Sequence, residues 1–183
     1  MAGLIELIDP ARIGSVRHGL NVIAPDASVN TSRQAVIGVN GNRLGLWSVL
    51  AAHRWTPAAA VIHPRAMLSL SAKIGDGSIV GPLAVVGAES VLGEHTLVGR
   101  GSLIGHHVVI EAGATIYSGA NIGGTSRIGC GAQIGMGAIV LNTIHIGAGA
   151  IVAAGAVVTR HVPDGIRVQG VPAQVYGVGK ALS

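Results

Sequence analysis

The sequence contains no phenylalanine, and its two tryptophans and two tyrosines leave it with only 2% aromatic residues. This composition excludes an ordinary core built around aromatic side chains. Charged residues are also scarce, at 11%, whereas 49% of the chain is hydrophobic, a balance that excludes intrinsic disorder. The single cysteine, Cys130, cannot form an internal disulfide, so we expect a reducing, cytoplasmic location.

Long apolar runs and clusters of basic residues are absent as well. The longest run of glycine and aliphatic residues, 146–158, is too short to span a bilayer, and the N-terminus shows no secretory-signal pattern. The net charge is +4, but the twelve lysines and arginines are scattered singly. We therefore expect neither a membrane nor a nucleic acid as partner, and isolated arginines instead suit a small phosphorylated ligand.

Glycine, by contrast, is abundant, with 29 of 183 residues, and it takes part in a repeat of six residues. Every sixth position from Ile62 to Val158 is aliphatic, without an insertion. A period of six is three times the strand period and does not fit a helix, so each hexad predicts a short strand followed by a corner. The second corner position is expected to need positive φ, and it is glycine in eight hexads: Gly77, Gly101, Gly113, Gly119, Gly131, Gly137, Gly149 and Gly155.

Three hexads close a triangular coil of eighteen residues, so residues 62–163 predict between five and six coils. The expected fold is all-β, a parallel β-helix that resembles the left-handed hexapeptide-repeat proteins. A core this narrow takes one aliphatic side chain per face, which accounts for the missing phenylalanine. Its stability comes from the stacking of coils, and the ends of the stack need caps.

The residues on either side of the repeat follow other rules. Residues 1–61 predict a small, Rossmann-like α/β lobe, because apolar strands alternate there with a helix. The expected elements are strands at 4–9, 35–39 and 58–62 and a helix at 42–54. Residues 164–183 form a tail that we expect to cap the last coil.

The outward position just before each core aliphatic residue indicates how the chain assembles. In the first coils this position is itself aliphatic: Ile79, Val85, Val91, Leu97, Leu103 and Val109. Exposed aliphatic residues on successive coils require a cover, which identical copies around a three-fold axis would provide. We therefore predict a homotrimer, in which the polar outward residues from Thr115 to Gln133 mark a wet groove.

His106 is the first candidate for chemistry, because it stands at a corner of the predicted β-helix. Residues eighteen apart stack on one edge, about 4.8 Å per coil, so Gly124, Asn142 and Arg160 follow above it. This edge suits a long, thin ligand with a phosphate tail. A neutral imidazole can take a proton from an attacking amine or hydroxyl. Glu111, on the same coil, either orients this imidazole or is simply solvated.

A zinc site is an alternative role for this histidine. Some hexapeptide-repeat trimers resemble γ-class carbonic anhydrases, in which histidines of neighbouring subunits share a zinc ion. That pattern requires a second histidine five residues after the first, and position 111 is a glutamate. His95 and His145 do not supply the spacing either, so we expect no bound metal and regard a zinc lyase as the lesser alternative.

Several segments carry a resemblance to a known family, and the resemblance covers most of the chain. Residues 148–163, followed by 170–173, resemble the C-terminal signature shared by the hexapeptide acyltransferases. Residues 62–66 and 104–110 resemble a narrower group within them. These two resemble sugar acetyltransferases of the sialic acid O-acetyltransferase and bacillosamine-pathway N-acetyltransferase type. The resemblance implies an enzyme that uses acetyl-CoA to acetylate an amino or hydroxyl group of a sugar, expected to be nucleotide-linked.

The resemblance also implies roles for individual residues. His106 would be the catalytic base, and Arg160 would meet a phosphate of CoA. Backbone amides near Gly124 and Ala154 would hold the thioester and the pantetheine, and Asp9 stands where the family has the acidic strand end of its nucleotide-sugar pocket. The expected cofactor-binding residues are therefore Gly124, Asn142, Ala154 and Arg160.

Two features depart from the pattern of the family. The family usually has an acid directly after its histidine, but this chain has His107 there. The family also has a glycine-rich loop before its first strand, and none is seen before Leu4. Either Glu111 replaces the missing acid or the base is weaker. A non-catalytic β-helix scaffold is therefore the alternative to an enzyme, and acetyl-CoA binding would distinguish the two.

Overall fold

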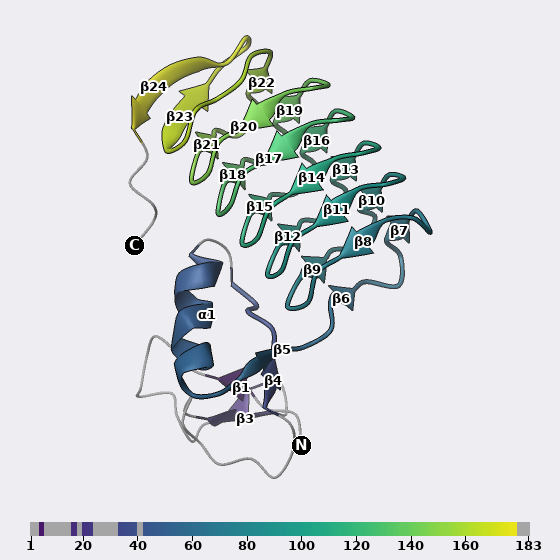
Figure 1. Cartoon of the computed structure of the whole chain (residues 1–183), viewed down its shortest axis with the longest axis vertical. Helices are drawn as coiled ribbons and strands as arrows, with labels where there is room; N and C mark the ends of the chain where they lie inside the picture. The colour runs from purple at the N-terminus through teal and green to yellow at the C-terminus, as the bar shows by residue number, and fades with distance from the viewer. Residues whose placement is uncertain (1–3, 6–15, 18–19, 24–32, 40–41, 179–183) are drawn as a thin grey trace.

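The computed structural model describes residues 4–5, 16–17, 20–23, 33–39 and 42–178 (Figure 1). Its main body is a three-sided β-helix in which a two-residue strand recurs every six residues. Seventeen such strands follow one another: β6 (Val61–Ile62), β7 (Met67–Leu68), β8 (Lys73–Ile74), β9 (Ile79–Val80), β10 (Val85–Val86), β11 (Val91–Leu92), β12 (Leu97–Val98), β13 (Leu103–Ile104), β14 (Val109–Ile110), β15 (Thr115–Ile116), β16 (Asn121–Ile122), β17 (Arg127–Ile128), β18 (Gln133–Ile134), β19 (Ile139–Val140), β20 (His145–Ile146), β21 (Ile151–Val152) and β22 (Val157–Val158).

These strands form three parallel sheets, one on each face of the triangular prism. The β6 face contains β6, β9, β12, β15, β18 and β21, the β7 face contains β7, β10, β13, β16, β19 and β22, and the β8 face contains β8, β11, β14, β17 and β20. Each strand pairs with the strand eighteen residues later, as Val85 pairs with Leu103. The prediction of a left-handed parallel β-helix with eighteen residues per coil is confirmed.

Turns of four residues join the faces at three corners. The β6–β7 corner comprises 63–66, 81–84, 99–102, 117–120, 135–138 and 153–156. The β7–β8 corner comprises 69–72, 87–90, 105–108, 123–126 and 141–144, and 159–162 continue it after β22. The β8–β6 corner comprises 75–78, 93–96, 111–114, 129–132 and 147–150.

Glycine permits both the bend and the close stacking of these corners. All eight glycines predicted at the second corner position adopt left-handed backbone, with φ between 63° and 72°. The residue that follows each strand is often glycine for another reason, because a Cβ at Gly135 would lie 2.5 Å from the amide nitrogen of Ala154 on the next coil. Six residues other than glycine hold the left-handed conformation at equivalent corners: Leu83, Glu89, His95, His107, Thr125 and Thr143.

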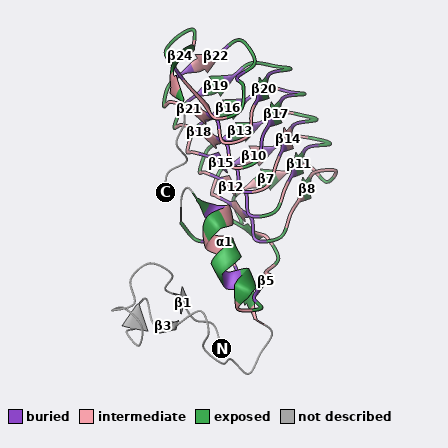
Figure 2. Ribbon diagram, turned by 60° about the vertical axis from the view of Figure 1, so that its left-hand side comes forward, coloured by how far each residue is buried: buried purple, intermediate pink, exposed green. Residues whose placement is uncertain are grey.

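The core of the β-helix is a column of aliphatic side chains, one from each strand. From Val80 to Val158 these side chains are at most 2% exposed (Figure 2). Small residues line the column beside the corners, and their hydroxyl groups are hydrogen-bonded: the Ser90 hydroxyl donates to the Gly105 carbonyl and accepts from the Val108 amide. The column has no room for larger side chains, as the absence of phenylalanine predicts.

The N-terminal part forms two small sheets and a helix. One sheet consists of β1 (Leu4–Ile5), β3 (Leu20–Ile23) and β2 (Val16–Arg17), in that order. In the other, β4 (Gln34–Ala35) pairs in parallel with β5 (Thr56–Pro57), and α1 (Arg43–Ala52) connects the two strands. Leu50 of α1 packs with Ala35, Ile37 and Trp55 in a separate small core.

The predicted β–α–β pattern is confirmed in outline, with shorter strands. The strand expected at 35–39 is only Gln34–Ala35, and the one expected at 58–62 divides into β5 and β6. Asn42 lies at the N-cap of α1 but forms no capping hydrogen bond through its side chain. Of the strand expected at 4–9 only β1 is described, and Asp9 lies outside the described residues.

The C-terminal residues extend the prism beyond its last coil. β23 (Ile166–Gln169) pairs in parallel with β21 and adds a seventh parallel strand to the β6 face. β24 (Gln174–Val178) returns antiparallel to β23, and the Ala173 amide donates to the Val157 carbonyl. The tail thus covers the open end of the β-helix, where Val168 becomes buried.

The outward aliphatic side chains lie on all three faces of the prism. Leu103 on the β7 face is 45% exposed and Val91 on the β8 face is 39% exposed, whereas Leu97 on the β6 face is half-buried. Met67 and Leu83, near the start of the prism, are more than half exposed. Among the described residues, no helix is long and apolar enough to cross a membrane.

Candidate functional site

The structure places His106, Gly124 and Asn142 on successive coils of the β7–β8 corner, as their spacing predicts. The Thr125 amide donates to the His106 carbonyl, and the Thr143 amide donates to the Gly124 carbonyl, each at 2.9 Å. These bonds join the three coils into one continuous edge. Arg160, which is exposed, follows β22 at the upper end of this edge.

Gly124 leaves the space that the imidazole of His106 occupies. A Cβ at Gly124 would lie 2.8 Å from His106 Nε2 and 3.0 Å from its Cε1. On the other side, a Cβ at Gly123 would lie 2.5 Å from Asn142 Oδ1. Two adjacent glycines therefore bring a ring nitrogen and an amide oxygen close to the same stretch of backbone, and larger residues would separate them.

His106 and His107 form a pair at this edge. Their Nδ1 atoms are 3.0 Å apart, and the two rings meet edge to face at 86°. His107 has a φ of 54°, as expected for the second corner position. The repeat uses this position for backbone geometry and would favour a side chain that points outward, but the His107 ring meets His106 through its own side-chain torsion. When His106 Nδ1 carries the shared proton, its Nε2 has a free lone pair beside Gly124.

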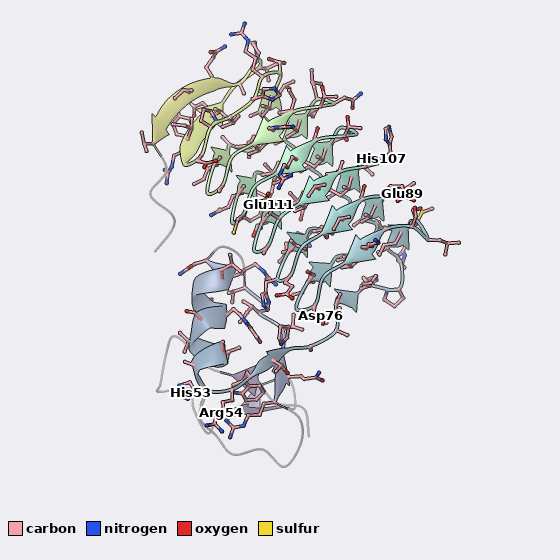
Figure 3. All side chains as sticks on the ribbon, viewed as in Figure 1. His53, Arg54, Asp76, Glu89, His107 and Glu111 are labelled. Carbon is pink, nitrogen blue, oxygen red and sulfur yellow. The ribbon has the colours of Figure 1, made fainter. Side chains whose placement is uncertain are left out.

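Glu111 does not join this pair within the chain. It lies at the β8–β6 corner, whereas the histidines lie at the β7–β8 corner, and Figure 3 shows Glu111 and His107 on different sides of the prism. Its carboxylate accepts from Arg127 Nε at 2.9 Å and from the Cys130 amide at 3.0 Å. Within one chain, Glu111 therefore does not orient the His106 imidazole, which is one of the two roles considered for it.

The predicted cofactor-binding residues divide between two corners. Gly124, Asn142 and Arg160 share the β7–β8 edge, but Ala154 lies at the β6–β7 corner, one coil above Gly135. Residues eighteen apart share an edge, and 154 differs from 124 by thirty, so this separation follows from the repeat itself. The chain alone does not bring Ala154 to the histidine.

A groove on the β8 face contains titratable residues that the sequence analysis did not connect. It has a volume of about 450 Å³, and its lining includes Glu111, Arg127, His145, His161 and Asp164. The His145 amide donates to His161 Nδ1 at 3.0 Å, and the rings are 5.0 Å apart. The Ala148 amide donates to Asp164 Oδ1 at 2.8 Å. Positions 127 and 145 both point outward and are eighteen residues apart, and this spacing could have indicated that they lie side by side in the groove.

The chain is similar to known proteins in its repeat family and in its structure. Residues 125–160 match the family described as bacterial transferase hexapeptide (six repeats). Among solved structures, the acetyltransferase domain of PglB from Neisseria gonorrhoeae is 34% identical to this chain and gives a TM-score of 0.84. The match covers 95% of this chain and 87% of the PglB domain chain. The same domain has been solved with acetyl coenzyme A, at 33% identity.

A second relative is the perosamine N-acetyltransferase of Caulobacter crescentus. A variant of it, solved in complex with CoA and GDP-perosamine, has 28% identity and a TM-score of 0.81, and it covers 87% of this chain and 79% of its own. A comparison with curated protein sequences gives no significant match. In the described part of the chain, no three His, Cys, Asp or Glu side chains gather closely enough to hold a metal ion.

Proposed function

The chain belongs to the hexapeptide-repeat acyltransferases, with acetyl-CoA as co-substrate, and on this basis we propose that it acetylates an amino or hydroxyl group of a nucleotide-linked sugar. The observation that carries the proposal is the likeness over nearly the whole chain to two acetyltransferases, one of which was solved with a nucleotide sugar. Membership of this enzyme family argues against a non-catalytic scaffold. From its single free cysteine, Cys130, we also propose a cytoplasmic location.

The proposed reaction is a direct attack of the acceptor on the thioester. The acceptor nitrogen or oxygen forms a bond to the acetyl carbon, and His106 Nε2 takes the proton that this atom loses. The carbon–sulfur bond then breaks, and the imidazolium returns the proton to the CoA thiolate. Backbone amides at the corner stabilise the negative charge on the carbonyl oxygen while the bond forms.

The division of the site between corners supports a homotrimer. Gly124, Asn142 and Arg160 offer one edge for the extended pantetheine and the phosphates of CoA. Ala154 and Glu111 lie at the other two corners, so they contribute to this site only where a neighbouring copy presents one of its corners. We therefore propose that three copies pack around a three-fold axis and that the cofactor lies between two of them.

Arg160→Ala tests the proposed phosphate contact. We expect this variant to bind CoA about tenfold more weakly, because one charge-assisted hydrogen bond is lost. Isothermal titration with CoA and with dephospho-CoA gives the two affinities, and dephospho-CoA loses less if the contact is to the 3′-phosphate. Arg127→Ala is the matched control, since Arg127 is exposed but paired with Glu111 in the groove. Weakening in the control alone would move the phosphates to the β8 face.

Gly124→Ala tests whether the imidazole must lie over this glycine. The added Cβ would occupy the space of His106 Nε2, and a displacement of about 1 Å can cost a factor of about 10² in rate. We expect slower acetyl transfer with an unchanged far-ultraviolet circular dichroism spectrum. Gly177→Ala serves as control, because a Cβ there meets nothing within 4 Å. Full activity of Gly124→Ala would contradict the placement of His106 in the site.

The acceptor is best identified with a panel of nucleotide-linked sugars. UDP-, GDP- and CMP-linked amino sugars are incubated with acetyl-CoA, and free CoA is measured with a thiol reagent. Mass spectrometry then identifies the acetylated product, and mild alkali separates the two chemistries, because an ester is cleaved and an amide is stable. Turnover with an unlinked sugar only would contradict the nucleotide-linked acceptor.

A further inference from the structure

The N-terminal helix is attached to the prism at the β8–β6 corner. Gly77, His95 and Gly113 follow one another there at intervals of eighteen residues, with φ of 70°, 56° and 69°. The side chain of Leu44 lies where a Cβ of Gly113 would be, and Arg43 donates from Nε to the His95 carbonyl at 2.7 Å. The first turn of α1 therefore packs directly on three coils of the β-helix.

His95 is enclosed at the centre of this contact. Its side chain is 2% exposed, and its ring lies 4.3 Å from that of Trp47, at an angle of 30°. On the opposite side the ring occupies the space that a Cβ of Gly77 would need. Neither ring nitrogen has a hydrogen-bond partner in the described part of the chain. A neutral imidazole tolerates this environment, whereas a charged one would have two N–H groups and no acceptor.

A buried cation accompanies the ring. Arg43 is 1% exposed, and it also donates to the Val39 and Gly77 carbonyls at 2.8 and 3.3 Å. Burial lowers the pKa of Arg43 to about 10, so it stays charged at neutral pH. Among the described residues its hydrogen-bond partners are all carbonyl oxygens, so no carboxylate there offsets its charge directly.

The charged groups around His95 come from four segments. α1 presents Arg43, and the corner of His95 itself carries Glu94. The coil below presents Asp76, whose carbonyl accepts from the His95 amide, and the coil above carries Glu111, which is bound to Arg127. Burial lowers the pKa of His95, the charge of Glu94 partly opposes this, and the charge of Arg43 adds to it.

We propose that His95 is a pH-sensitive contact that holds α1 on the β-helix while the imidazole is neutral and releases it when the ring is protonated. A proton on the ring needs a hydrogen-bond acceptor or water, and the enclosure between Trp47 and Gly77 supplies neither. Moving the first turn of α1 away from the corner gives the ring access to water and separates it from Arg43. The hydrogen bonds that join the coils at this corner, from the His95 amide to the Asp76 carbonyl and from the Gly113 amide to the Glu94 carbonyl, do not involve α1.

The direction of the pH effect on docking follows from the lowered pKa of His95. The pKa of His95 is lower in the docked state than in water, so docking is strongest above the ordinary histidine value of about 6.5. As the pH falls below that value, the docking equilibrium weakens by at most about tenfold per pH unit, until the ring is also protonated in the docked state.

Hydrogen exchange measured by mass spectrometry on the full chain tests this directly. Each peptide is compared with the denatured chain at the same pH, which removes the intrinsic dependence of exchange on pH. Between about pH 7.5 and about pH 5, we expect peptides from α1 to lose more than about tenfold of their protection, while peptides from β15 to β18 keep theirs. Equal loss in both regions, or no loss in α1, would overturn the proposal.

Three variants separate protonation of His95 from other causes. His95→Leu removes the titrating group without a new backbone conformation, because Leu83 holds a φ of 60° at an equivalent corner. It should keep α1 protected at acid pH. Gly77→Ala, whose Cβ meets the ring, should weaken docking at every pH. His53→Gln, at the C-cap of α1, is the matched control and should keep the pH dependence. Loss of protection at acid pH in His95→Leu would assign the effect to another group.

Discussion

His106→Ala is expected to reduce acetyl transfer by a factor of about 10²–10⁴, the usual cost of removing a general base. The affinity for acetyl-CoA should remain unchanged, because the backbone edge from Gly124 to Asn142 is not altered. The rate is measured as CoA release with one acceptor, and the affinity by titration calorimetry. A parallel fall in affinity would mean that the imidazole binds the cofactor instead of taking a proton.

His107→Gly is the control for this prediction. Glycine is the residue that eight hexads have at the same corner position, so the left-handed backbone is kept. The variant removes the His107 ring, and with it the contact between the two Nδ1 atoms and the edge-to-face ring contact, and we expect a loss of about tenfold from a less well oriented base. An inactive His107→Gly with an active His106→Ala would reverse the two roles. Full activity of both would rule out a histidine base at this edge.

The fold could be predicted because each hexad repeats the same local information. An inward aliphatic residue such as Ile128 and a corner glycine such as Gly131 define one side of a coil, and the unbroken period of six places every later coil above the last. Stacking at intervals of eighteen residues therefore predicted that His106 and Gly124 are adjacent. The boundaries of the N-terminal strands were less predictable, because that part has no repeat and each strand is only two to four residues long.

The side-chain contacts of the site could not be predicted in the same way. The ion pair between Glu111 and Arg127 joins residues sixteen apart, across the offset between a corner and the outward side of a strand. Which way the His107 ring turns depends on a side-chain torsion that the sequence pattern does not specify. The burial of His95 depends on where α1 lies, and this position is set by the packing of Arg43 and Leu44 on the prism, not by the hexad.

The double variant Leu97→Arg, Leu103→Arg is expected to abolish the proposed homotrimer. The two residues lie on the β6 and β7 faces, on either side of the corner formed by 99–102, and Leu103 is 45% exposed in the single chain. Two arginines at this edge would place six charges near one three-fold axis, where they would be desolvated and would repel one another.

Light scattering coupled to size-exclusion chromatography measures the outcome, and monomers or aggregates are expected in place of trimers. Lys73→Arg, on the β8 face, is the matched control, because it leaves the charge unchanged and should keep the trimer. The coil core should survive in the double variant, since neither leucine belongs to the buried column. Acetyl transfer should fall with the loss of the trimer, because Ala154 and the histidine pair lie at different corners of one chain. A soluble monomer of the unaltered chain, or a fully active monomer of the variant, would refute the trimeric site.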